Sequence, residues 1–113
     1  MKLKEINNNK ENFRKIVIKF VNEIDTLAKD VEPDEEKDFT KKFNKALKIL
    51  DPIYKEISNV TISTKTKAHT ISALVRPRVT YIKNIINNVD FDTAYEQSIV
   101  TDHINIMITD LER

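Results

Sequence analysis

The chain has 113 residues and contains no glycine, and this absence limits the folds that are open to it. Glycine is the residue that tight hairpin turns, strained turns and phosphate-binding loops require. P-loop and dinucleotide-binding folds are therefore disfavoured. What remains is a fold made of helices.

Apolar residues recur at intervals of three and four along most of the chain, as they do on one face of an amphipathic helix. The pattern breaks at Pro33, near Asn59 and at Asn87, where proline or asparagine suits a helix end. The sequence therefore predicts an all-α fold with four helices, near residues 8–31, 34–58, 61–87 and 90–112. Pro52 either kinks or breaks the second of these helices, and Pro77 is expected to kink the third.

The connections between these predicted helices are short, and short connections favour antiparallel neighbours. We therefore expect a single domain, residues 1–113, that forms an antiparallel up-down-up-down four-helix bundle. A chain of this length can bury a core without a metal or a disulfide. The predicted apolar faces include Leu74 in the third helix and Ala94, Tyr95 and Ile99 in the last, and Tyr81 is placed near the core.

Two capping boxes are predicted at helix starts. Asn8 is followed three residues later by Glu11, and Thr93 is followed three residues later by Glu96. In this motif the first side chain accepts a backbone N–H bond inside the helix, and the acid reaches back to the cap.

The segment from Ile57 to Val89 contains no acidic residue, in a chain whose formal net charge is only +1. Residues 52–88 hold six basic residues and one acidic residue, whereas residues 89–113 hold six acidic residues and one basic residue. At about 100° per residue, one side of the third predicted helix collects polar and basic side chains. This predicted basic ridge consists of Lys65, His69, Ser72, Arg76, Thr80 and Lys83.

The ridge admits two interpretations. If it faces solvent, its cations and hydroxyls suit phosphates or an acidic protein surface. If the acidic last helix covers it, its charges are compensated within the fold. Lys67 and Arg78 fall toward the apolar side of the same helix, where a long side chain must snorkel to water or mark a helix end.

His69 lies in a segment that resembles the phosphoacceptor site of histidine-phosphotransfer domains, over only about five residues. That family presents an exposed histidine on a four-helix bundle, typically followed closely by a lysine and a small residue. Here Ser72 and Ala73 stand instead. The resemblance implies phosphotransfer through His69, with Lys65 or Arg76 as the source of positive charge.

No other motif indicates catalysis. His103 lies within an apolar arc, which predicts a hydrogen-bonded histidine at the core or its rim. The Glu-x-x-His pairing of di-iron bundles is absent, because Val100 precedes His103 and Thr66 precedes His69 at that spacing. The sequence thus predicts no metal and no cofactor, and it gives little support to an enzyme.

Three functions follow as hypotheses. The first is a non-enzymatic binding or accessory protein, such as an adaptor, an inhibitor or an immunity-like protein, whose basic ridge contacts an acidic protein partner. The second is a small helical subunit that binds nucleic-acid backbone, and the third is phosphotransfer through His69. No cysteine, apolar signal core or spanning helix is evident, so a cytoplasmic protein without membrane contact is expected. The sequence does not predict the oligomeric state.

Overall fold

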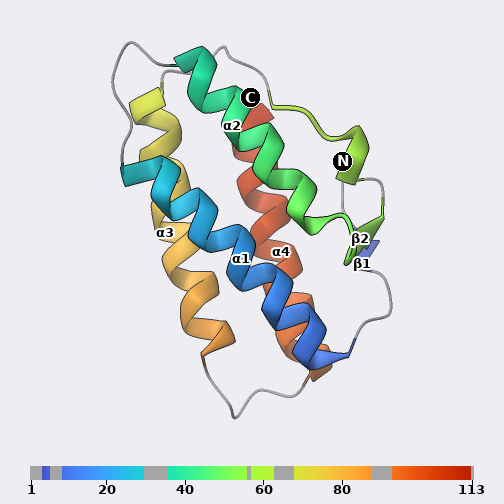
Figure 1. The fold of residues 1–113 in the computed structure, drawn as a ribbon. Coiled ribbons are helices and arrows are strands. Elements are labelled where there is room, and N and C mark those ends of the chain that lie inside the picture. Colours follow the sequence, from blue (N-terminus) through green and yellow to red (C-terminus); the bar gives the residue numbers. More distant parts are fainter. Residues whose placement is uncertain are drawn as a thin grey trace.

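A computed structural model describes residues 4–5, 9–29, 36–55, 57–62, 68–87 and 93–112 of the chain. These residues form four α-helices, which Figure 1 shows along the length of the molecule. The helices are α1 (Lys10–Lys29), α2 (Glu36–Leu47), α3 (Ala68–Ile86) and α4 (Thr93–Glu112). The predicted all-α class is confirmed.

The helix predicted for residues 34–58 ends at Leu47, so this expectation was wrong at its C-terminal end. Past Leu47 the chain forms a 3-10 turn, in which the backbone N–H of Asp51 donates to the carbonyl of Lys48 at 3.1 Å. Pro52 follows, and proline has no N–H to continue a helical bond. The 3-10 turn is η1 (Lys48–Leu50). It is followed by the short strand β2 (Tyr54–Lys55) and a second 3-10 turn, η2 (Ile57–Asn59).

Pro77 has a different effect, because α3 continues through it. Proline has no N–H, so one backbone carbonyl of α3 loses its helical hydrogen bond. The Pro77 ring is exposed, so this carbonyl lies on the solvent side of the helix. The helix begins at Ala68, later than the predicted start near residue 61. Residues 60–62 lie outside any helix, and residues 63–67 fall outside the described part of the chain.

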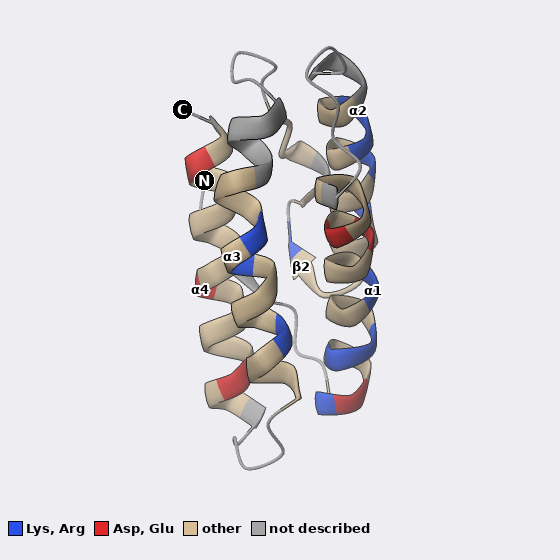
Figure 2. Cartoon of the chain, turned by 90° about the vertical axis from the view of Figure 1, so that its left-hand side faces the viewer, with Lys and Arg blue, Asp and Glu red and all other residues tan. Residues whose placement is uncertain are grey.

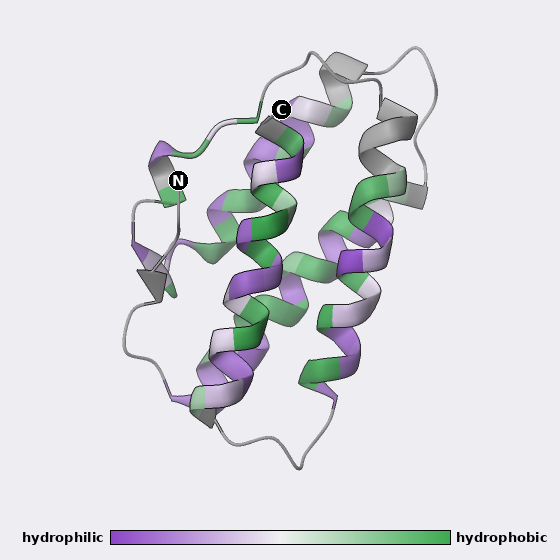
Figure 3. Ribbon diagram, turned by 180° about the vertical axis from the view of Figure 1, so that it is seen from behind, coloured by the Kyte–Doolittle hydropathy of each residue, from purple (hydrophilic) through white to green (hydrophobic). Residues whose placement is uncertain are grey.

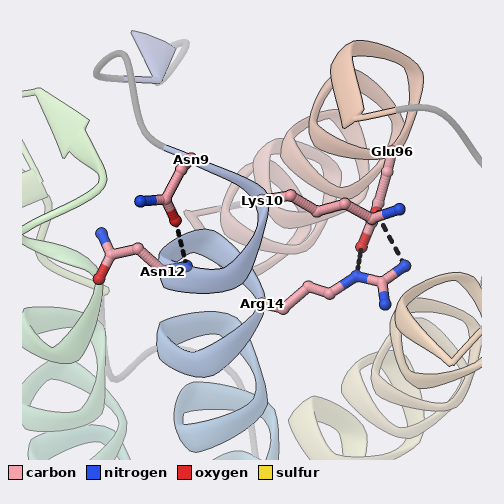
Figure 4. Close-up of polar contacts among 5 residues, drawn as sticks. All are labelled: Asn9, Lys10, Asn12, Arg14 and Glu96. Carbon is pink, nitrogen blue, oxygen red and sulfur yellow. Dashed lines mark hydrogen bonds and ion pairs between the residues drawn. The ribbon is translucent and has the colours of Figure 1, made fainter.

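The cap of α1 is Asn9, one residue after the predicted Asn8, which lies outside the described residues. Figure 4 shows the Oδ1 atom of Asn9 accepting the backbone N–H of Asn12 at 2.7 Å. Asparagine at this position satisfies one of the N–H groups that a helix start leaves without a partner.

The order of the helices differs from the predicted up-down-up-down bundle. Figures 1 and 2 show α1 and α4 running one way and α2 and α3 running the other. The early end of α2 makes this order possible, since η1, β2 and η2 follow it and lead back toward the end of the bundle where α3 begins (Figure 1). About 20 residues separate the end of α2 from the start of α3, and about 3.3 Å of reach per residue is ample for the return.

The result is two helical hairpins stacked as two layers, α1 with α2 and α3 with α4 (Figure 2). Helix α1 packs against both α2 and α3, and α3 packs against α4. The core lies between the layers. Its largest fully buried side chains include Phe13, Phe20, Phe43, Leu47, Ile82 and Ile104.

The returning segment is fixed to the core by Tyr54. Strand β2 pairs antiparallel with β1 (Lys4–Glu5), and the Tyr54 side chain is 1 % exposed. Its hydroxyl lies 2.9 Å from the Thr101 hydroxyl of α4, and its ring meets the Phe13 ring edge-on at 6.2 Å. Asn44 of α2 fixes the next stretch, because its amide donates to the Ile62 carbonyl and accepts the Ile62 N–H.

Glu96 of α4 joins the two layers, while its predicted capping partner, Thr93, has a side chain outside those that are described. Its side chain is 1 % exposed, and Figure 4 shows the Arg14 guanidinium of α1 reaching both of its oxygens. The Arg14 Nε–Glu96 Oε1 distance is 2.6 Å and the Nη2–Oε2 distance is 3.0 Å. The Lys10 ammonium lies 3.9 Å from Oε2. A buried carboxylate needs such partners, because desolvation of an unpaired charge is costly.

Several residues predicted on apolar faces lie on the surface. Leu74 is 40 % exposed, and Tyr81 and Tyr95 are each 51 % exposed. Ala94 is exposed as well, and Ile99 is half-buried. The apolar arcs of α3 and α4 are wider than the core that covers them, so their edges face outward.

Candidate functional site

The predicted basic ridge falls on α3, but the structure describes only part of it. Arg76 and Thr80 are exposed, and Lys83 is half-buried. His69 and Ser72 belong to α3, but their side chains are not among those described. Lys65 lies outside the described residues.

Lys83 is already bound within the fold. Its ammonium donates to the Asp25 carboxylate of α1 at 3.2 Å. The described ion pairs of Lys83 and Glu96 thus both run to α1, whereas one of the two interpretations of the sequence was that the last helix neutralises the third.

Arg78 and His103 meet between α3 and α4. The Arg78 Nη1 atom lies 3.1 Å from His103 Nδ1, and the Tyr81 ring lies against the imidazole with centroids 4.3 Å apart. A guanidinium can only donate, so Nδ1 accepts and the imidazole is neutral. Burial lowers the pKa of His103, the Arg78 charge lowers it further, and Asp102 partly opposes them. The predicted rim histidine is confirmed.

The largest gathering of exposed cations in the described structure lies on the other hairpin. Six exposed lysines lie on α1, α2 and η1, at positions 15, 19, 41, 42, 45 and 48. Local net charge does not reveal these lysines, because acidic residues are interleaved with them along the chain. The spacing of Lys41, Lys45 and Lys48 at four and three was the available signal, since it places them on one helical face.

A groove runs between α1 and α2 beside these lysines, with a volume of about 420 Å³. Its floor is apolar: Ala46 is buried, and Leu27 and Ile49 are half-buried. Its rim carries four exposed charged side chains, Lys19, Glu23, Lys42 and Lys45. We call this site, made by the seven residues just named, the lysine groove.

The lysine groove is suited to binding an amphipathic anion. Its three ammonium groups attract negative charge, and its floor gains stability when apolar groups displace water. Volumes of this size are typical of ligand sites and of grooves that receive a few side chains.

Within the described ranges, no three histidine, aspartate or glutamate side chains lie together where they could hold a metal ion. None of the described helices is long and apolar enough to span a bilayer. No family model, curated protein or solved structure matches the chain. Function is therefore inferred from the surfaces of the described structure.

Proposed function

We propose that this is a binding protein whose lysine groove receives an acidic amphipathic helix of a protein partner. The observation that carries the proposal is the apolar floor of Leu27, Ala46 and Ile49 beneath a rim with three lysines and one glutamate. This combination of chemistry matches a helix with apolar residues on one face and carboxylates beside them.

The mode of binding is a helix laid in a groove. In such complexes apolar residues spaced at three and four enter the groove, and charges at its edges set orientation and partner choice. Lys19 lies on the α1 edge, whereas Lys42 and Lys45 lie on the α2 edge, so cations flank the bound helix on both sides.

The α3 ridge is the second candidate surface for an acidic partner. Among its described side chains Arg76 and Thr80 are exposed, but Lys83 is engaged by Asp25. The lysine groove is favoured over the ridge because its charged rim surrounds a hollow with an apolar floor, and an amphipathic helix needs both features.

A nucleic-acid backbone is the alternative ligand for the exposed lysines. Phosphate and sugar have no apolar groups to fill the floor of the groove, so the floor favours a peptide. The exposed Tyr81 and Tyr95, which could stack on bases, belong to the opposite hairpin.

Binding of a glutamate-rich helical peptide with leucines spaced at three and four tests the proposal. We expect Lys42→Glu with Lys45→Glu to weaken binding about tenfold or more, since each reversal replaces an attraction by a repulsion. The matched control is Lys15→Glu with Lys41→Glu, which changes net charge equally but lies outside the groove. The control should bind nearly as the wild type does.

Equal losses of peptide affinity in the two double variants would show that the interaction is only nonspecific charge attraction. Tighter binding of duplex DNA or RNA than of the peptide, lost in both variants, would favour the nucleic-acid function instead.

Phosphotransfer through His69 stays a separate prediction, since the side chain is not among those described. Incubation with acetyl phosphate tests it directly. A phosphohistidine that is present in the wild type and absent in His69→Gln would support the prediction, and a wild-type protein that takes up no phosphate would refute it.

A further inference from the structure

The two edges of the lysine groove differ in charge. The α2 edge carries two exposed lysines, Lys42 and Lys45, whereas the α1 edge carries Lys19 and Glu23, which are also exposed. Figure 3, which views the molecule from behind, shows α3 and α4 in front of α1 and α2, so a ligand approaches the groove from the opposite side, where both edges meet it. A bound helix therefore turns one flank to two cations and the other flank to one cation and one anion.

Glu23 is not neutralised by a neighbour within the described part of the chain. Lys19 lies one turn earlier on the same helix, but neither residue forms an ion pair with the other or with another described residue. A lysine that precedes a glutamate by four residues is also the less favourable order for pairing along a helix. The carboxylate of Glu23 is therefore available to a ligand, in a groove whose other charged groups are ammonium groups.

Glu23 lies midway along the groove. Helices α1 and α2 run in opposite directions (Figure 1), so Lys19 and Ile49 lie toward one end of the groove, and Leu27 and Lys42 toward the other. Lys19 and Leu27 are eight residues apart, which is about 12 Å or two helical turns, and Glu23 is halfway between them. A helix that fills the groove must therefore pass Glu23 with the middle of one flank.

We infer that Glu23 makes the lysine groove specific for a helix of mixed charge. The partner carries carboxylates on the flank that faces α2 and a lysine or arginine at the middle of the flank that faces α1, a pattern that rests on the proposed function. An acidic residue at that middle position would bring two carboxylates together, and like charges across an interface exclude wrong partners. A uniformly acidic helix and a nucleic-acid backbone are disfavoured for the same reason.

Three helical peptides that differ at one position test this specificity. All share leucines spaced at three and four with glutamates beside them, and the variable position, at the middle of one flank, is lysine, glutamine or glutamate. Fluorescence anisotropy at fixed ionic strength measures their affinities. For the wild type we expect the lysine peptide to bind about fivefold more tightly than the glutamate peptide, with glutamine between them, although the lysine peptide carries the least negative charge. In Glu23→Lys the order should reverse.

Glu11→Lys is the matched control. It changes the net charge by the same amount, and Glu11 is exposed on α1, outside the groove. Its distance from Glu23 along the helix is about 18 Å, which exceeds the screening length of about 8 Å at physiological salt, so this variant should keep the wild-type order. Circular dichroism confirms that each variant is folded.

The outcomes separate this specificity from the proposed function. If none of the three peptides binds the wild type, the proposed function fails and the specificity fails with it. If the peptides bind but Glu23→Lys keeps the wild-type order, Glu23 is not the determinant, and the proposed function is unaffected. If the glutamine peptide binds as tightly as the lysine peptide, the groove only rejects acid, and the basic residue expected in the partner is wrong.

Discussion

The two hairpins bury the same core but present opposite surfaces. The α1–α2 hairpin and η1 expose six lysines, three of which line a groove with an apolar floor. The α3–α4 hairpin exposes leucine, isoleucine and two tyrosines, with little charge between them. Helices of similar length thus expose mainly charged side chains in one layer and large apolar side chains in the other.

The difference shows that net charge along a sequence is a poor guide to a charged surface. The acid-free segment contributes Arg78 and Lys83 to contacts within the fold. The charge-balanced first half of the chain supplies the exposed lysines, because helical geometry sorts interleaved acids and bases onto different sides.

Removing the ion pair between Arg14 and Glu96, which joins the two layers, should have the largest effect on the free energy of unfolding. In Arg14→Met, Glu96 keeps Lys10 at 3.9 Å but loses its two short bonds. Removing one partner of a buried ion pair lowers the free energy of unfolding by about 3–5 kcal/mol. Because Lys10 still lies near Glu96, we expect a loss of about 3 kcal/mol. Urea denaturation measures it.

The double variant Arg14→Met with Glu96→Leu is the control, since it leaves no buried charge without its partner. We expect it to regain most of the lost stability. A double variant as unstable as Arg14→Met alone would show that the packing of Arg14, and not its charge, joins the layers.

Removing the hydroxyl that fixes the returning segment should have a smaller effect. Tyr54→Phe keeps the buried ring but leaves the Thr101 hydroxyl without this bond. We expect a loss of about 1–2 kcal/mol in the free energy of unfolding. Thr101→Val in the Tyr54→Phe background should then cost less than Thr101→Val alone, and strictly additive losses would argue against the bond.

Acid should weaken the α3–α4 hairpin through His103. Its lowered pKa means that the unfolded chain binds the proton more readily. The stabilising contribution is complete above the ordinary value near 6.5 and is lost as pH falls toward the lower folded pKa. Denaturation at about pH 7.5 and about pH 5 should show a larger decrease for the wild type than for His103→Phe. Equal decreases in both proteins would remove His103 as the cause.

Substitutions on the outer surfaces should change folding stability least. We expect Lys45→Glu and the control substitution Lys41→Glu to change the free energy of unfolding by about 0.5 kcal/mol or less. Thermal denaturation measures this. A large loss of stability in either variant would show that its surface stabilises the fold, and a binding defect could then not be assigned to the groove.

Helical periodicity was enough to predict the all-α class and most of the core. The positions of α1 and α4 follow from their apolar spacing, with ends near those expected. The end of α2 could not be predicted, because the apolar stripe continues across Pro52 to Ile57 in residues that are buried but not α-helical. Burial of Ile53, Tyr54 and Ile57 in a returning segment produces the same pattern as burial in a helix.

The candidate sites were harder to predict than the fold. Whether Lys83 reaches water depends on Asp25, which is 58 residues away in the chain. The exposure of Tyr81 and Tyr95 depends on how much of each apolar arc the neighbouring helices cover. Such long-range relations leave no local signal, although the spacing of the α2 lysines was visible in the sequence.

Chemical-shift mapping of the backbone amides during titration with the acidic amphipathic peptide tests the central claim most directly. We predict that the largest changes fall around the lysine groove, at Lys19, Leu27, Lys45 and Ile49, while α3 and α4 change little. The Lys42→Glu with Lys45→Glu variant should lose these changes at equal peptide concentration. Changes centred on Arg76 and Thr80 of α3, with the groove unaffected, would contradict the account.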